Sequence, residues 1–172
     1  MTDYIPTILG ALGAIAGGAA TQCFTLWRES HSGNKARFRD MQFIGGELII
    51  RLIELRYQCR EAGDDNGTPT MVNGQQEDIV TTHVEDFSLG DVQGKWESLP
   101  PDLQFRIREI PSRLKEIDRW LERFYAIHYS PPENSEYFGH RHDLYYSIAN
   151  SAEELIEILR NICKLPKSDL YP

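Results

Sequence analysis

The densest group of potential metal ligands in the sequence consists of His140, His142 and Asp143. Imidazole nitrogens and carboxylate oxygens are ordinary zinc ligands. On an α-helix, however, residues two positions apart point about 200° away from each other, and only an extended backbone would bring both imidazoles to one face. The sequence has no HExxH motif and no cysteine–histidine zinc spacing. We therefore expect a solvated helix start here, with no metal and no cofactor.

Motifs for other kinds of catalysis are also missing from the sequence. It has no GxSxG nucleophile elbow, no GxxxxGKS/T phosphate loop and no GxGxxG dinucleotide motif. Glu85, Asp86 and Asp91 could pair for general acid–base chemistry, but the carboxylates of an acidic loop are more often simply solvated. We therefore expect no enzymatic activity.

The composition disfavours two further classes of protein. The 172 residues carry a net charge of −8, whereas nucleic-acid binders usually carry positive charge or a long basic stripe. The three cysteines, Cys23, Cys59 and Cys163, are too widely spaced for a disulfide framework. Few, widely spaced cysteines are typical of a protein in a reducing compartment. We expect Cys59 and Cys163 to be buried thiols.

Aromatic residues gather near the start of the last expected helix. Dense aromatic side chains beside a loop are typical of a surface that binds a partner. Packing into the core and capping of the helix is the simpler alternative. The possible partner surface comprises Tyr137, Phe138, Tyr145 and Tyr146.

The N-terminal segment has no charged residue between Asp3 and Arg28. As an α-helix, residues 4–27 would measure about 36 Å, which is enough to cross a hydrocarbon core of roughly 30 Å. Tyr4 and Trp27 stand at its two ends, where amphipathic rings favour the headgroup level. The segment therefore predicts a single transmembrane helix.

Two alternatives to a membrane span remain open. Large apolar side chains are sparse after Gly13, and Gln22 is polar, so membrane insertion would be marginal. A cleaved signal peptide would need a basic N-terminal region, which Met1-Thr2-Asp3 does not supply. A buried helix of a soluble protein is the other alternative.

One side of the expected span carries only small residues. At about 100° per residue, this side includes a GxxxG pair, and such a face lets a second helix approach closely in a membrane. We expect self-association through this face, although glycine is common in spans and the pattern could arise by chance. The face consists of Gly10, Gly13, Ala14, Gly17 and Thr21.

Basic residues follow the expected span and none precedes it. By the positive-inside rule, residues 1–3 lie outside the cell membrane and the C-terminal domain is cytoplasmic. The basic side chains are expected to contact anionic lipid headgroups. They are Arg28, Lys35, Arg37 and Arg39.

The remaining chain shows three long apolar stripes with alternating spacings of three and four residues, which is typical of amphipathic helices. We expect a break at His31–Asn34 and then a first helix. A second helix continues, kinked, through Pro111, and a third ends near Lys164. The stripes lie at 38–59, 103–124 and 144–162.

Residues 61–99 are rich in acidic side chains and glycine, and Lys95 is their single basic residue. We read them as a long acidic connection with one short helix near 76–87. A strand pair that includes Ile79 and Val80 is the alternative, although no clear partner strand follows.

Together these patterns predict an all-α protein. A single transmembrane helix (4–27) and a juxtamembrane linker (28–36) precede a cytoplasmic bundle (37–165) of three long helices in up-down-up, antiparallel order with a short fourth element. We expect a membrane-anchored interaction module, an adaptor, sensor or regulator, that contacts membrane lipid, itself and a protein partner. The alternative is a membrane effector whose glycine-rich helices oligomerise and perturb the bilayer.

Overall fold

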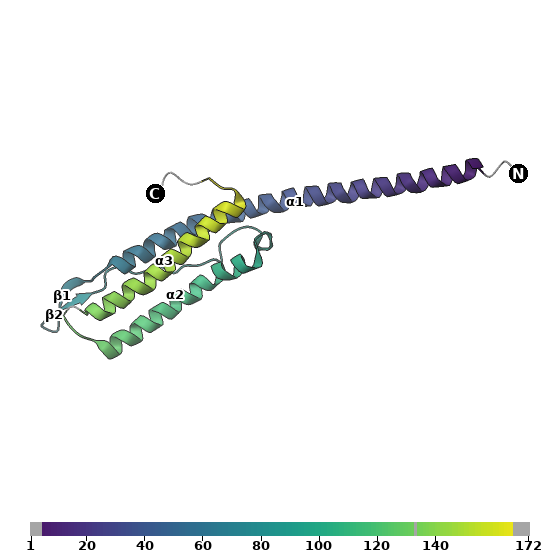
Figure 1. The fold of residues 1–172 in the computed structure, drawn as a ribbon. Helices are drawn as coiled ribbons and strands as arrows, with labels where there is room; N and C mark the ends of the chain where they lie inside the picture. Colours follow the sequence, from purple (N-terminus) through teal and green to yellow (C-terminus); the bar gives the residue numbers. More distant parts are fainter. Residues whose placement is uncertain (1–4, 133, 167–172) are drawn as a thin grey trace. The chain divides into compact units, whose positions relative to one another are not determined.

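A computed structural model describes the backbone of residues 5–132 and 134–166, and the side chains of 33–132 and 134–166. Two compact units follow one another along the chain, Met1–Arg39 and Asp40–Pro172. Most of the described chain is helical, and one small sheet is present (Figure 1). In chain order the elements are α1 (Ile5–Asp64), β1 (Thr68–Val72), β2 (Gln75–Ile79), the 3-10 turn η1 (Trp96–Ser98), α2 (Pro101–His128) and α3 (Ser135–Cys163).

The first unit is helical from Ile5 onwards. The predicted break at His31–Asn34 is wrong, because α1 continues through it without interruption. A glycine inside a helix costs only about 1 kcal/mol relative to alanine, and extension of an existing helix is favourable on both sides of it. The segment 28–36, predicted to be a linker, is therefore part of α1.

The side chains of the predicted membrane span lie outside the described residues. Within the described part of the chain, no helix combines the length and the apolar character needed to cross a bilayer. The span at 4–27 has no structural support and stays a prediction.

The second unit is a bundle in which α3 runs antiparallel to both other helices. The end of α3 contacts the start of this part of α1, where Gln42 Nε2 donates to the Cys163 carbonyl at 3.0 Å. The start of α2 likewise meets the later part of α3, where Arg106 and Glu154 form an ion pair at 2.9 Å. Because α1 and α2 both oppose α3, they run parallel to each other (Figure 1).

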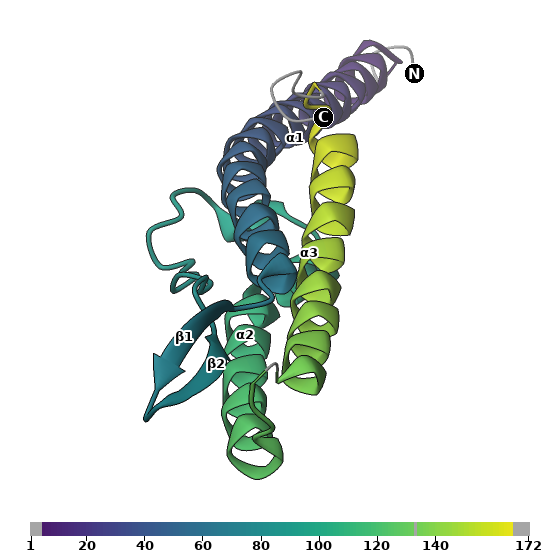
Figure 2. The same ribbon diagram turned by 90° about the vertical axis from the view of Figure 1, so that its left-hand side faces the viewer.

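The predicted up-down-up order is therefore wrong for the first pair of helices. The long connection carries the chain back along the bundle before α2 begins, so α2 starts at the end of the bundle where its part of α1, from Asp40, begins (Figures 1 and 2). The predicted antiparallel packing of α2 on α3 is confirmed.

The apolar stripes form the core of the bundle. Ile107 and Ile110 of α2 and Ile148 of α3 are fully buried or nearly so. The helix α2 runs unbroken through Pro111, as its in-phase stripe predicted. In α1 the most deeply buried side chains include Ile44, Leu48, Leu52, Leu55 and Cys59.

The fourth element is a β-hairpin rather than a short helix. Strands β1 and β2 pair antiparallel, with Thr68 opposite Ile79. Asn73 and Gly74 form the turn with φ values of 51° and 83°. An Asn-Gly pair tolerates positive φ at both central positions, which two-residue hairpin turns of this twist require. The hairpin lies at the end of the bundle where α1 ends (Figures 1 and 2).

The rest of the acidic connection is ordered against the bundle. We call residues 80–95 the return segment. Phe87, Leu89 and Val92 pack partly buried against the core, and Lys95 forms an ion pair with Asp40 at 2.8 Å. At Gly94, φ is 129° and a Cβ would lie 2.9 Å from Ile44 Cβ, so only glycine suits this close crossing over α1.

Candidate functional site

Arg141 of α3 is the most deeply buried charged side chain among the described residues, with 2% of its surface exposed. Its guanidinium donates hydrogen bonds to the carbonyls of Ala62 and Thr82 and lies 3.4 Å from Asp65 Oδ2. The Tyr145 ring lies beneath it, with its centroid 5.3 Å from the guanidinium carbon. Arg141 thus joins the end of α1, the return segment and α3.

The Asp65 carboxylate completes this arrangement. It accepts hydrogen bonds from the backbone N–H groups of Gly67 at 2.9 Å, Thr81 at 2.9 Å and Thr82 at 2.8 Å. Burial alone would raise the pKa of Asp65, but these hydrogen bonds outweigh it and lower the pKa. Asp65 therefore stays ionised and balances the charge of Arg141, so the pair serves the fold.

A second buried carboxylate fastens the hairpin to the bundle. Glu77 faces inward from β2, and its oxygens accept hydrogen bonds from the hydroxyls of Tyr125 and Tyr129. Asn134 Nδ2 approaches the same carboxylate at 3.5 Å. The hydrogen bonds from Tyr125 and then Tyr129 lower the pKa of Glu77 against the opposing effect of desolvation.

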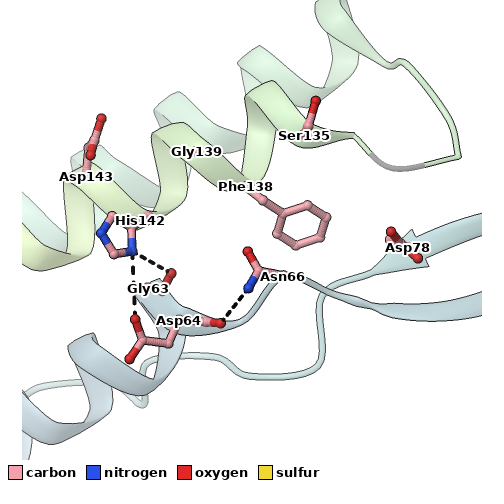
Figure 3. Close-up of a pocket in the computed structure, with 9 residues that line it drawn as sticks. All are labelled: Gly63, Asp64, Asn66, Asp78, Ser135, Phe138, Gly139, His142 and Asp143. Carbon is pink, nitrogen blue, oxygen red and sulfur yellow. Dashed lines mark hydrogen bonds and ion pairs between the residues drawn. The ribbon is translucent and has the colours of Figure 1, made fainter.

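An open pocket of about 840 Å³ lies between the end of α1, β2 and the start of α3 (Figure 3). His142 points from α3 toward α1, with Nδ1 3.1 Å from the Gly63 carbonyl oxygen and 3.8 Å from Asp64 Oδ1. Asp143 points away from this pair in Figure 3. No group of three or more potential metal ligands occurs among the described residues.

The histidines of the expected helix start therefore play separate roles. His142 stacks on Tyr146, with ring centroids 4.2 Å apart. His140 packs edge-on against Trp120 and Phe124 of α2. The helix α3 begins at Ser135, before both of them, and its geometry turns the two imidazoles to different neighbours.

A smaller pocket of about 340 Å³ lies between α2, α3 and the return segment. The Tyr145 hydroxyl donates to Asp118 Oδ1 at 2.9 Å inside it, and burial raises the pKa of Tyr145. The charge of Arg141 is already balanced by Asp65. The carboxylates of Asp118 and Glu122 therefore give this pocket a negative charge. Its lining comprises Val80, His83, Asp118, Leu121, Glu122, Tyr125, Tyr137, Arg141 and Tyr145.

The structure divides the four aromatic residues of the predicted partner surface: three line one or the other of these pockets, and Tyr146 lines neither. Phe138 and Tyr145 are buried, and Tyr137 is half-buried with its ring 5.2 Å from that of Tyr125. Tyr146 is half-buried and donates to Asp64 Oδ1 at 2.9 Å. Phe138 lines the larger pocket, whereas Tyr137 and Tyr145 line the smaller one.

The other predicted site residues belong to the first unit. The side chains of the small-residue face (Gly10, Gly13, Ala14, Gly17 and Thr21) and of Arg28 lie outside the described residues. Lys35, Arg37 and Arg39 are exposed on α1.

The two described cysteines are buried thiols. Burial raises the pKa of Cys59 to about 12 and that of Cys163 to about 11, so neither is a thiolate at neutral pH. Cys163 lies against Gly45, where any Cβ would overlap its sulfur. The predicted burial of both thiols is confirmed.

An exposed apolar stripe on α1 was not found from the sequence. Phe43, Ile50 and Tyr57 recur every seven residues and expose 56%, 64% and 38% of their surfaces. We call these three residues the α1 stripe. Their seven-residue spacing on the side away from the core stripe was the available signal, and it was missed because the buried stripe already explained the helix.

Comparisons with protein-family models, with curated proteins and with solved structures give no match for this chain.

Proposed function

We propose that the protein is a membrane-anchored helical interaction module, an adaptor, sensor or regulator that acts through protein–protein contacts. The observation that carries the proposal is the α1 stripe. Large apolar side chains in a row on one helix of a packed bundle are typical of a surface that a partner covers. Phe43 and Ile50 expose more than half of their surfaces and lie seven residues apart on one face of α1, whereas the exposed Phe105 and Ile127 of α2 lie far apart along that helix.

The polar clusters support a binding role over a catalytic one. Arg141, Asp65 and Glu77 use their hydrogen-bonding atoms to join helices, hairpin and return segment. A group engaged in this way must lose fold-stabilising contacts before it can act on a substrate.

The anchor is argued from the sequence and from the exposed basic residues. An uncharged segment long enough to cross a bilayer precedes Lys35, Arg37 and Arg39, which are free to meet anionic headgroups because they are exposed. On this proposal the bundle lies on the cytoplasmic side.

Fractionation of cells that express the full chain tests the anchor. We expect the protein in the membrane pellet after alkaline carbonate extraction. Recovery in the soluble fraction would contradict the anchor.

Site-specific photo-cross-linking in the same cells tests the contact surface. A cross-linker in place of Ile50 should give a discrete adduct with one protein, whereas one in place of Phe105, which is 69% exposed on α2, should not. Equal adducts at both positions, or none at Ile50, would refute the interaction surface.

A further inference from the structure

The α1 stripe lies between two flanks that belong to the same bundle. On one side the return segment is held to α1 by the ion pair of Arg51 with Asp91. On the other side α3 is held by Glu153, which pairs with Arg56 and Arg60. The face between these flanks is an exposed helix surface, long enough for several turns of a second helix.

The spacing along this face suits a helix as the occupant. Phe43, Gly46, Ile50 and Tyr57 lie on this face at intervals of three, four and seven residues, which match the heptad positions of a helix-packing seam. The heptad position between Ile50 and Tyr57 is Ile53, which is buried in the protein's own core. A Cβ at Gly46 would meet no atom within 4 Å, so a neighbouring helix can approach the backbone there.

A row of carboxylates runs beside the seam. Glu47, Glu54 and Glu61 are all exposed and recur every seven residues, each four residues after a member of the α1 stripe. The nearest arginines on α1 already pair with Asp91 and Glu153. The face therefore combines an apolar centre with a negatively charged edge, and it favours a positively charged partner.

A second copy of this chain fits the face poorly. In an antiparallel pair the two glutamate rows would face each other and repel. In a parallel pair each row would face Gln42, Ile49 and Arg56 of the other copy. Ile49 and Arg56 are buried in their own bundle, and Arg56 is already paired with Glu153. Neither orientation gives the glutamates a free cation.

We propose that the α1 stripe and its glutamate row bind a basic amphipathic helix of a partner protein. Apolar side chains of the partner helix lie on Phe43 and Ile50 and beside Gly46, and its lysines or arginines lie along Glu47, Glu54 and Glu61. This inference rests on the proposed function and specifies the chemistry of the partner.

The test uses two synthetic probes with the full chain. Both are amphipathic helices of about 18 residues with identical leucine positions, one with lysine and the other with glutamate on its polar face. The protein is held in discs of zwitterionic phosphatidylcholine and carries a photo-cross-linking residue in place of Tyr57 or of Phe105. Cross-linking counts only the probe bound beside that residue, so probe dissolved in lipid does not contribute.

We expect the lysine probe to cross-link at position 57 and not at 105, with half-saturation at a concentration about tenfold lower than for the glutamate probe. Ile50→Asp should weaken binding of the lysine probe at least about tenfold, because it removes a large apolar contact. Purely electrostatic attraction predicts the opposite, since the variant is more acidic. Undiminished binding to Ile50→Asp would overturn the proposal.

The second part of the experiment removes the negative charges of the glutamate row. Changing Glu47, Glu54 and Glu61 together to Gln should abolish the preference for the lysine probe. The same change in net charge at the exposed Glu109, Glu116 and Glu122 of α2 should leave it intact. Equal effects of the two triple variants would overturn the proposal, as would a dimer of the full chain that Ile50→Asp dissociates.

The outcomes separate this inference from the proposed function. If a partner cross-links at Ile50 in cells while neither probe binds position 57, the interaction module stands and the basic helix is refuted. If no partner contacts Ile50 in cells, the proposed function fails whatever the probes do.

Discussion

Arg141 carries a full charge into the interior of the protein, and its neighbours determine what that charge costs. Two backbone carbonyls accept hydrogen bonds from its guanidinium, and the Asp65 carboxylate balances its charge. Asp65 in turn accepts hydrogen bonds from three backbone N–H groups. Removing one member of such a set leaves the others desolvated without partners, which costs more than the intact pair contributes. The single residue therefore controls how three segments meet.

Replacing Arg141 tests this dependence. Arg141→Met should lower the free energy of unfolding by about 3–5 kcal/mol, because Asp65 and two carbonyls lose their buried partner. Urea titration followed by circular dichroism measures the change. The exposed Arg119→Met serves as a control and should stay within about 0.5 kcal/mol of the parent. A loss below about 1 kcal/mol at Arg141 would contradict the argument.

Glu77 and Asp65 make the free energy of unfolding depend on pH in the acidic range. Both have a lowered pKa in the folded state, so the unfolded chain binds more protons at low pH and stability rises with pH there. Their contribution is present above the unfolded pKa values of about 4 and is lost as the pH falls below them. Between about pH 4 and 2, Glu77→Gln should therefore show a shallower loss of stability than the parent. Parallel curves for the two proteins would refute the role of Glu77.

At the scale of the element, adjacent glycines of α1 have opposite roles. A Cβ at Gly45 would overlap Cys163 Sγ of α3, whereas one at Gly46 would meet nothing within 4 Å. The first glycine permits a close helix crossing inside the bundle, whereas the second makes no contact within the bundle that a methyl group would disturb and lowers the local helix propensity.

Two alanine substitutions separate these roles. Gly45→Ala should destabilise the fold by about 1–3 kcal/mol through overpacking, and adding Cys163→Ala should restore part of the loss. Gly46→Ala should be neutral or stabilise the protein by up to about 1 kcal/mol. Thermal unfolding of the four proteins measures the effects. A loss at Gly46 equal to that at Gly45 would contradict the assigned roles, because nothing lies within 4 Å of a Cβ at Gly46 and alanine has the higher helix propensity.

The elements differ in how far the sequence predicts them. The stripes of α2 and α3 predict helices because every third or fourth residue is large and apolar, and the buried positions follow that spacing. A strand pair at Ile79 was only the alternative to a short helix, because Thr68–Val72 and Gln75–Ile79 bury almost nothing. Its partner strand precedes Ile79, across the strong turn signal Asn73-Gly74, whereas the sequence was searched for one that follows. The Arg141 and Glu77 clusters were missed because they join residues 48 or more positions apart, which no local pattern reveals.

At the scale of the whole molecule, the proposed membrane anchor in the first unit would determine where the bundle acts. The expected small-residue face predicts that two copies associate through their first helices. In lipid such contacts depend on close packing, so a larger side chain must separate the backbones.

Gly17→Ile should therefore weaken self-association in a membrane two-hybrid assay. The change also raises hydrophobicity, so a loss of signal cannot come from poorer membrane insertion. Leu12→Ile, on the opposite side of the expected helix, is the control and should have no effect. Association of Gly17→Ile as strong as that of the parent would show that this face is no interface.

The return segment has a consequence for biosynthesis. Gln42 of α1 bonds to Cys163 at the far end of α3, a separation of 121 residues. Ribosomes add about 5–20 residues per second, so the apolar side of α1 waits on the order of 5–25 seconds for its partner to emerge. During that interval the nascent chain exposes Leu48, Leu52 and Leu55 to chaperones and to other nascent chains. The contacts of α1 with the return segment can form first, because that segment is translated earlier, whereas its contacts with α3 form only after the last helix has been translated.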